Sequence, residues 1–432
     1  MASNSDDSFK TSSHDVVVIG AGQAGLAASY FLDRQGVDHV VLERGRTGES
    51  WRTQRWDSFV VNTPNAINAL PGAPYDGPAA DGFQTRDELV ASFERYAERF
   101  ELPIRAGVEA EAVEKDPAHG EFTVRVRDAD GARQSIAARC VVVASGILNK
   151  PRVPAFAASL PPAIAQAHAG SYRNPEALPP GAVIVAGSGQ SGCQIAEELA
   201  ESGRKVFLCT SKVPRQPRRY RGRDIVEWEW DAGILHVKRG DLEDPSIMNS
   251  AQPQISGVGR YGHTISLQHL SSIGVELLGR ITGVQDGTLN LDASLRDNIR
   301  FADRTSEDDK RVIDEYIARK GIDAPAPEED PADTPWEDLD GLPMPSKLDL
   351  AAADVGSIVW CTGFSADFSW IAPPILDDAG KPAHDRGVSH VDGIYFVGFP
   401  WLHRRKSGII CGVEEDASHI VDHITSRLGN NA

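Results

Sequence analysis

The chain has 432 residues, of which 41% are apolar and 25% are charged, a composition typical of a globular protein with two or three domains. Its formal net charge of −18 at pH 7 repels nucleic-acid phosphates and anionic lipid heads, so neither nucleic acid nor a membrane is expected as a partner. The five cysteines are widely spaced, so no metal site is predicted. The first 14 residues contain no apolar signal sequence, and a cytoplasmic protein is therefore expected.

The first predicted elements are a strand, a helix and a second strand, at 15–20, 25–36 and 39–43. The motif GAGQAG, at 20–25, joins the first strand to the helix, and its glycines permit a tight turn and the close approach of a pyrophosphate. Glu43 ends the second strand, where its carboxylate would accept hydrogen bonds from ribose hydroxyl groups. This combination predicts a dinucleotide site.

The next predicted elements are a loop, a helix and several strands between residues 62 and 146. Residues 62–83 are rich in proline and glycine and are expected to form a loop, after which Thr85 and Glu88 form a capping box that starts a helix. Alternating apolar and polar residues over 108–139 predict antiparallel strands, and the apolar run 140–146 predicts another buried strand.

A second strand–turn–helix–strand pattern, at 182–210, repeats the first and contains the motif GSGQSG. Cys209 stands at the position that matches Glu43, so no carboxylate repels a 2′-phosphate there. Lys212 and Arg215 follow within a basic stretch. This arrangement favours NADPH over NADH, and a solvated basic surface is the alternative explanation of the stretch.

The acidic segment 323–342 has eight acidic residues, four prolines and no lysine or arginine. We expect it to be a surface excursion, with a cover over the substrate site as the alternative. The runs 357–364 and 393–400 predict buried strands, and 413–428 predicts the closing helix.

Two dinucleotide sites in one chain suit a reaction in which one cofactor stays bound and the other delivers hydride to it. A flavin and a nicotinamide react in this way. We therefore assign FAD to the first site and NADPH to the second. Because no dithiol pair is present, a disulfide reductase is disfavoured, and dioxygen is the simplest electron acceptor.

Beyond the glycine motifs, three segments carry a resemblance to a known family: GESWR (48–52), WCTGF (360–364) and GIYFVGFPWLHRRKSG (393–408). Over roughly residues 14–428 the chain resembles the class B flavin-dependent monooxygenases, which include the flavin-containing, Baeyer–Villiger and N-hydroxylating enzymes. Within that class it is most similar to the bacterial branch labelled as flavoproteins of potassium transport.

The resemblance implies an α/β fold with two doubly wound, Rossmann-like dinucleotide-binding domains, the second inserted in the first. We place the FAD-binding domain on 1–152 plus 350–432 and the NADPH-binding domain on 153–349. His168 and Tyr172 match the end of the family's linking signature, which is only partly kept, and no catalytic role is predicted for His168.

The resemblance also implies two catalytic residues. Asn62 lies in VNTPN, which is similar to the loop that holds an asparagine above the flavin, and Asn65 is the competing candidate. Lys406 lies in HRRKSG, which would border the flavin ring and stabilise negative charge on it or bind an acidic substrate. A turn residue and a solvated basic loop are the respective alternatives.

The predicted cofactor contacts come from the two glycine motifs, the strand ends and the family segments. They are Gly20, Gly22, Gln23, Ala24, Gly25, Glu43, Arg44, Trp51, Ser145, Gly146, Gly187, Ser188, Gly189, Gln190, Ser191, Gly192, Ser211, Lys212, Arg215, Thr362, Gly363, Gly398 and Ser407.

The activity implied is that of a single-component FAD- and NADPH-dependent monooxygenase. A C4a-(hydro)peroxyflavin would transfer one oxygen atom from dioxygen to a small organic substrate, by N- or S-oxygenation or a Baeyer–Villiger reaction. The alternatives are an NAD(P)H oxidase or reductase that oxygenates no substrate, and a nucleotide-binding redox sensor. The substrate's identity and the oligomeric state, monomer or homodimer, are left open.

Overall fold

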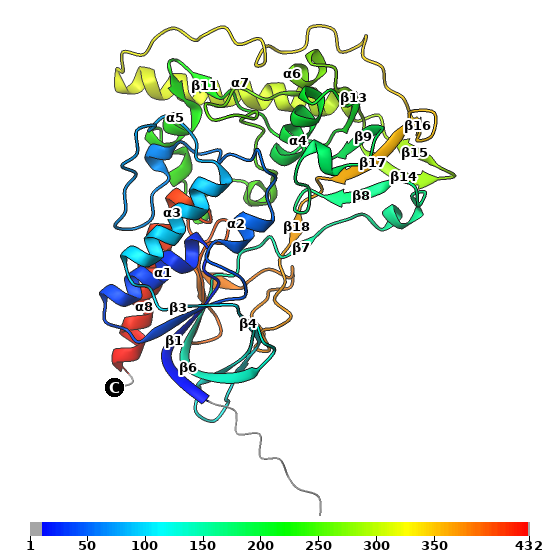
Figure 1. Cartoon of the computed structure of the whole chain (residues 1–432). Helices are drawn as coiled ribbons and strands as arrows, with labels where there is room; N and C mark the ends of the chain where they lie inside the picture. The colour runs from blue at the N-terminus through cyan, green and yellow to red at the C-terminus, as the bar shows by residue number, and fades with distance from the viewer. Residues whose placement is uncertain (1–10, 431–432) are drawn as a thin grey trace, which may run out of the picture.

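The computed structural model describes residues 11–430, which form two sheets with helices packed against them (Figure 1). The first sheet has nine strands, in the order β19-β20-β21-β6-β1-β2-β3, with the hairpin β4-β5 attached to β6. Its strands are β1 (Thr11–Ile19), β2 (His39–Glu43), β3 (Ile104–Ala106), β4 (Val108–Lys115), β5 (Phe122–Asp128), β6 (Arg133–Val143), β19 (His384–Asp385), β20 (Val388–Ser389) and β21 (Ile394–Phe396).

The centre of the first sheet is parallel and buried. β1 pairs with β2 on one side and with β6 on the other, and its valines are fully inaccessible to solvent. Continuous apolar runs of this kind are typical of strands that are covered on both faces. The helices α1 (Gln23–Arg34), α3 (Arg86–Arg99) and α8 (Val413–Asn430) lie side by side in Figure 1, and α3 begins at the predicted capping box.

The second sheet has five parallel strands in the order β13-β10-β9-β17-β8. Helix α4 (Gln190–Glu201) packs against β9 and β10, and α6 (Leu267–Ser272) packs against α4. The strands are β8 (Ala165–His168), β9 (Ala182–Ala186), β10 (Val206–Cys209), β13 (Glu276–Leu278) and β17 (Val355–Trp360).

One predicted boundary differs from the sheets. The division after residue 349 assigned 350–432 to the first domain, but Val355–Trp360 forms β17 and lies between β8 and β9. By sheet membership the second unit therefore extends to Trp360. The sequence could not decide this point, because a buried apolar run has the same pattern in either sheet.

The second unit is inserted in the first, as predicted. The chain leaves the first sheet after β6 and returns to it at β19, and the second sheet lies between these points. The two connections lie side by side, since β7 (Lys150–Pro151) pairs antiparallel with β18 (Phe364–Ser365). Arg152 N donates to Gly363 O at 2.9 Å and extends this pairing.

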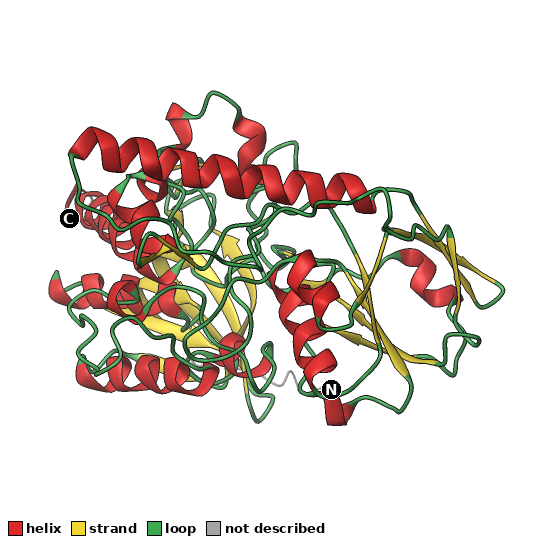
Figure 2. Cartoon of the chain, turned by 90° about the horizontal axis from the view of Figure 1, so that it is seen from above, coloured by secondary structure: helices red, strands yellow, loops and turns green. Residues whose placement is uncertain are grey.

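The remaining elements lie outside the two sheets. Figure 2 shows α7 (Leu295–Lys320), which has 26 residues, as a continuous helix along one edge of the molecule. The acidic segment 323–342 runs along α7 without helix or strand (Figure 1). The other helices and strands are α2 (Glu49–Thr53), α5 (Ile225–Asp231), α7 (Leu295–Lys320), β11 (Arg219–Tyr220), β12 (Arg223–Asp224), β14 (Ile281–Gln285), β15 (Thr288–Leu291) and β16 (Lys347–Asp349). Short 3-10 helices lie at Asn65–Ile67, Ala155–Ser159, Pro175–Ala177, Ile234–His236, Arg239–Asp241, Pro245–Asn249 and Ile410–Gly412.

Among residues 11–430, no helix combines the length and the apolar character that a membrane crossing needs. The cytoplasmic location stays a prediction.

Candidate functional site

The first glycine turn lies against the end of β6. Gly20 has φ +108°, and a Cβ placed on it would lie 2.6 Å from Ala144 O. A Cβ on Gly25 would lie 1.8 Å from Gly20 O, so neither position tolerates a side chain. Gly22 is different, because a Cβ there would meet nothing within 4 Å. The turn is thus closely packed on two sides and open at Gly22.

The open side coincides with the N-terminus of α1. Gly22 is the N-cap residue, it provides no side-chain hydrogen bond, and the first turn of α1 carries no acidic residue. The first amide groups of such a helix are free to bind an anion. Glu43 lies beside this turn, where its carboxylate accepts hydrogen bonds from Ala21 N and Gly45 N, both at 2.9 Å.

Segments that are distant in the sequence meet at this turn. Trp51 Nε1 donates to Gln23 Oε1 at 2.9 Å, and Gln23 Nε2 lies 3.5 Å from Gly408 O. A Cβ on Gly398 would lie 2.4 Å from Cβ of Ala24, so the chain after β21 passes directly over α1. The structure therefore brings two of the three family-like segments, 48–52 and 393–408, to the first turn, while Cys361 of the third lies at the second turn.

One polar atom at this turn lacks a partner. Ser145 Oγ is buried and forms no hydrogen bond within the described part of the chain. Ser145 follows Ala144, and its Cα would lie 3.3 Å from a Cβ on Gly20. A buried hydroxyl group without a partner costs free energy. The free space at Gly22, the uncapped helix and this hydroxyl group fit a bound dinucleotide.

The second glycine turn repeats the geometry of the first. Gly187 has φ +111°, and its Cβ would lie 2.6 Å from Cys361 O, just after β17. A Cβ on Gly192 would lie 1.8 Å from Gly187 O, whereas a Cβ on Gly189 would meet nothing within 4 Å. Residues 187–192 therefore form a second cradle at the N-terminus of α4.

Two predicted contacts of the second turn are engaged with the protein itself. Gln190 Nε2 donates to Ser256 O at 2.5 Å and its Oε1 accepts from Ile255 N at 2.8 Å. Ser188 Oγ accepts a hydrogen bond from Ser211 N at 3.0 Å. Both side chains therefore shape the walls of the turn, which leaves the backbone amides for a ligand.

Cys209 ends β10 at the position that corresponds to Glu43. Its side chain is 2% exposed, and burial raises the pKa of the thiol to about 12. The group is therefore uncharged near neutral pH and exerts no repulsion on a phosphate nearby.

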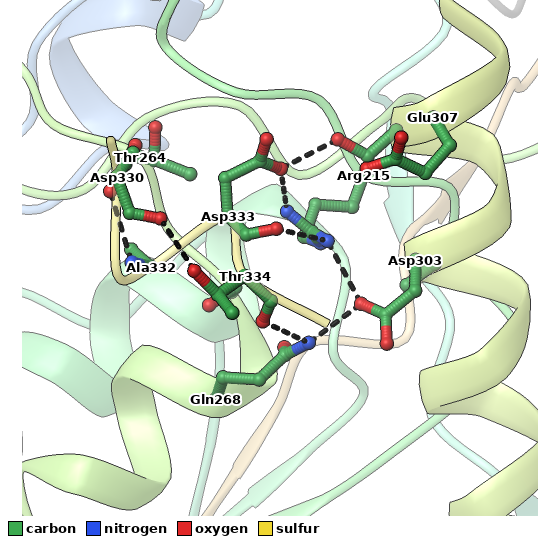
Figure 3. Close-up of polar contacts among 12 residues, drawn as sticks. Arg215, Thr264, Gln268, Asp303, Glu307, Asp330, Ala332, Asp333 and Thr334 are labelled. Atoms are coloured by element: carbon green, nitrogen blue, oxygen red, sulfur yellow. Dashed lines mark hydrogen bonds and ion pairs between the residues drawn. The ribbon is translucent and has the colours of Figure 1, made fainter. Parts of the chain in front are cut away.

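Arg215 lies in a buried ionic network with acidic residues (Figure 3). Its side chain is fully buried, and it pairs with Asp303 at 2.8 Å and with Asp333. Asp333 also accepts hydrogen bonds from Ser306 Oγ at 2.6 Å and Lys310 Nζ at 2.8 Å. These contacts argue against the predicted contact of Arg215 with a cofactor phosphate. The contacts of Asp333 with Ser306 and Lys310 also hold the acidic segment against α7.

Lys212 is exposed and is the first cation in the basic stretch after β10. Its Nζ lies 4.7 Å from the centre of the Phe301 ring, and no carboxylate pairs with it within residues 11–430. Lys212 follows Ser211, which lies at the second turn. Lys212 is therefore the better candidate than Arg215 for the contact with a 2′-phosphate.

The two candidate asparagines differ in their contacts. Asn65 Nδ2 donates to Ala79 O at 2.9 Å and holds its own loop together. Oδ1 is buried without a partner in both residues, but the Asn62 side chain forms no hydrogen bond at all among the described residues, while its carbonyl oxygen accepts from Arg218 Nη1 at 2.8 Å. The backbone of Asn62 is thus fixed and its side-chain amide is available.

Lys406 is 8% exposed, so it does not lie in a solvated basic loop. Its Nζ lies 3.3 Å from Glu415 Oε2 and 4.8 Å from the centre of the Trp230 ring. Glu415 also pairs with Arg404 at 2.7 Å, and Ser407 Oγ accepts from the backbone N–H of Arg404 at 3.1 Å. These contacts balance the charge of Lys406 and hold its segment on the first turn of α8.

His168 joins the two connections between the units. Its Nδ1 accepts from Gly170 N at 3.1 Å, so its Nε2 carries the proton and donates to Gly363 O at 3.0 Å. Burial lowers the pKa of this imidazole, which keeps it neutral. Thr362 Oγ1 donates to Arg152 O in the same region. These residues act in the linkage, in keeping with the absence of a predicted catalytic role for His168.

Three further predicted cofactor residues make no contact that tests their role. Arg44 is exposed, Ser191 is half-buried, and Gly146 has φ +69° with free space for a Cβ. Their roles stay predictions.

A cavity of about 900 Å³ lies between α3 and the loop at 65–84. Residues of the second unit, Arg260 and Tyr261, line it together with Ile410 at the start of a 3-10 helix. This contribution could not be predicted from the sequence, because Arg260 and Tyr261 stand in an irregular stretch without a motif.

Comparisons with known proteins agree with this architecture. Residues 17–227 match the family described as pyridine nucleotide-disulphide oxidoreductase. An uncharacterized CzcO-like oxidoreductase from Geobacillus kaustophilus (strain HTA426) is 33% identical, over 95% of this chain and 98% of its own. Indole-3-pyruvate monooxygenase YUCCA1 from Oryza sativa subsp. japonica is 26% identical, over 72% of this chain and 77% of its own. A mutant flavin monooxygenase from Stenotrophomonas maltophilia has the same fold, with TM-score 0.65 and 19% identity over 96% of this chain and 99% of its own.

The chain therefore belongs with the CzcO-like oxidoreductases, with which it shares nearly its whole length. It is also similar to flavin-dependent monooxygenases in sequence and in fold. The predicted family resemblance and fold class are thereby confirmed, and the comparisons agree with FAD and NADPH as the predicted cofactors.

The two open glycine positions allow a matched test of which cofactor binds where. Gly22→Val and Gly189→Val should both fold normally, because each Cβ enters free space and neither residue has a positive φ. We expect Gly22→Val to purify with little flavin. Gly189→Val should keep its flavin and show a raised KM for NADPH. Full flavin content in Gly22→Val, measured by absorbance after denaturation, would contradict the assignment.

Arg215→Ala should lower thermal stability, because it leaves Asp303 and Asp333 without their buried cation. Breaking one partner of a buried ion pair costs about 3–5 kcal/mol. Arg219→Ala, at an exposed position of the same stretch, is the control and should change Tm little. If Arg215→Ala instead keeps its Tm and loses NADPH affinity alone, the residue contacts the cofactor after all.

Proposed function

We propose that this protein is a single-component monooxygenase in which the first unit holds FAD and the second delivers hydride from NADPH. The observation that carries the proposal is the pair of equivalent glycine turns, each open at its middle glycine and each at a helix N-terminus. A duplicated dinucleotide cradle in one chain suits two dinucleotide cofactors of different roles.

In the first unit, the amide groups of α1 would bind the FAD pyrophosphate and Glu43 the adenosine ribose. The segment at Gly398 and Gly408 lies over the same helix, and we place the flavin end of the cofactor beside it. When bound and reduced, the flavin supplies the electrons and the oxygen activation that the protein's own side chains lack.

In the second unit, the free amides of α4 would bind the NADPH pyrophosphate. Lys212 is exposed and follows the turn, and the neutral thiol of Cys209 stands where a carboxylate would reject a 2′-phosphate. These two features support a preference for NADPH over NADH.

Asn62 is proposed to donate a hydrogen bond to the oxygen that is to be transferred. A neutral amide suits this task because it donates an N–H without releasing a proton near neutral pH. The support is that the Asn62 side-chain amide donates no hydrogen bond among the described residues, whereas Asn65 Nδ2 is bonded within its own loop, and that Arg218 fixes the Asn62 backbone. Lys406 is proposed to act with Glu415 by holding the neighbouring segment in place, and not as a free cation.

The substrate is proposed to be a small organic molecule that enters through the cavity between α3 and the loop at 65–84. Aromatic side chains are prominent in its lining, among them Tyr75, Phe83 and Tyr96. NADPH-dependent oxygen uptake tests the proposal as a whole. Candidate compounds with soft nitrogen, sulfur or carbonyl centres should give oxygenated product in place of hydrogen peroxide. Peroxide alone with every compound would favour an oxidase.

Lys212→Ala should raise the KM for NADPH and leave that for NADH almost unchanged. A hydrogen bond to a charged group contributes about 1.5–3 kcal/mol, so a change of about ten-fold or more is expected. Lys205→Ala is the matched control, since Lys205 is an exposed lysine beside β10 that pairs with Glu276. Equal use of NADPH and NADH by the unaltered enzyme would refute the role of Lys212.

Asn62→Ala should leave the rate of flavin reduction by NADPH unchanged and increase the release of hydrogen peroxide. Losing one hydrogen bond in a buried site costs about 1–3 kcal/mol, which corresponds to about five- to a hundred-fold in the rate of peroxide loss. Asn65→Ala is the control, and it should lower stability because Asn65 Nδ2 holds Ala79 O. If Asn65→Ala uncouples the reaction and Asn62→Ala does not, the two roles are exchanged.

A further inference from the structure

A cluster of two histidines and one glutamate lies on the second unit, on the side of α4 that faces the loop at 254–263. The carboxylate of Glu197 is fully buried. Its Oε1 lies 2.6 Å from His263 Nε2 and 2.9 Å from His269 Nε2, and its Oε2 accepts from Val258 N at 2.7 Å. The three ligand atoms lie within 4.8 Å of one another.

Three separate elements hold these side chains in place. Glu197 stands on α4, and His269 stands on α6, where Ser266 Oγ caps the helix by accepting from His269 N at 2.9 Å. His263 lies against Gly257, where a Cβ would come 2.1 Å from its Nε2. The imidazole therefore needs a glycine at that position in order to reach the carboxylate.

We propose that Glu197, His263 and His269 bind one divalent transition-metal ion of the zinc class. Two imidazole nitrogens and one carboxylate oxygen are ligands that Zn²⁺ accepts, and three protein ligands leave a fourth position for water. In the metal-free cluster both Nε2 atoms donate protons to the same Oε1. The ion takes the place of these two protons: a neutral imidazole moves its proton from Nε2 to Nδ1, and an imidazolium releases it to solvent. Small shifts of the side chains then bring the three ligand atoms to metal–ligand distances of about 2.0–2.2 Å.

Solvent reaches the two histidines, while the glutamate is buried and held by a hydrogen bond. The side chains of His263 and His269 are 42% and 25% exposed, whereas that of Glu197 is inaccessible. An ion can therefore enter from the histidine side and meet a carboxylate that Val258 N already orients. Outer hydrogen bonds of this kind fix metal ligands in their binding geometry.

The loop that the ion would fix connects the second glycine turn with the first unit. Gln190 and Gln194 bind the carbonyl groups of Ser256 and Gly257, so the loop lies along α4 from its N-terminus to Glu197. Further along, Arg260 pairs with Glu88 at the start of α3 at 2.5 Å. A bound ion would thus fix the middle of the loop at 254–263, which links the two units.

The test uses the full-length flavoprotein, treated with a chelator and then titrated with Zn²⁺ alone. We expect about one tightly bound zinc per chain by calorimetry and by metal analysis after desalting. His263→Ala and the double variant His263→Ala/His269→Ala should lose it. His119→Ala is the control, because His119 pairs on the surface with the single carboxylate of Asp116 and should retain the zinc.

A thermal shift provides the second measurement. Zinc should raise the Tm of the parent and of His119→Ala and leave that of His263→Ala unchanged, and His263 is exposed enough for its replacement to be tolerated. Zinc that the double variant still binds is adventitious, since the five thiols remain in it. Equal zinc binding by the parent and the double variant, or none by the parent, overturns the proposal and leaves a hydrogen-bonded triad.

Discussion

The structure depends on two close approaches of backbone to backbone. At Gly20 and Gly187 the chain passes so near to Ala144 O and Cys361 O that no side chain fits between them. Each contact ties a strand–helix turn to the end of the neighbouring strand, and so fixes where the helix N-terminus points. The connection between the units starts directly after each contact, at Ser145 and at Thr362. The same few atoms therefore position the nucleotide cradles and the path of the chain between them.

The parts of the fold that could be predicted are those written in local patterns. The glycine turns, the buried strands and the capping box of α3 depend on residues a few positions apart, and the repeat of the first pattern showed that a second unit exists. What could not be predicted depends on distant partners. Arg215 is neutralised by Asp303 and Asp333, which are 88 and 118 residues away. Glu197 meets its histidines across 66 and 72 residues.

The candidate site shows the same division. The sequence identified Asn62 and Asn65 as competitors, but only the contacts of their amide groups separate them, because Asn65 Nδ2 is already bonded to its own loop. Lys406 was recognised as a cation near a helix start, and its burial against Glu415 and Trp230 was not visible in the pattern. Residue type and position thus suggest the chemistry, while the available donors and acceptors decide which group can perform it.

The paired connections have a consequence for how such a protein is assembled and altered. Because β7 and β18 lie side by side, the chain enters and leaves the second unit at neighbouring points. The second unit is therefore one continuous insertion, and the two chain ends that it leaves in the first unit lie close together. Insertions or substitutions within the second unit can thus alter it without changing the strand order of the first sheet.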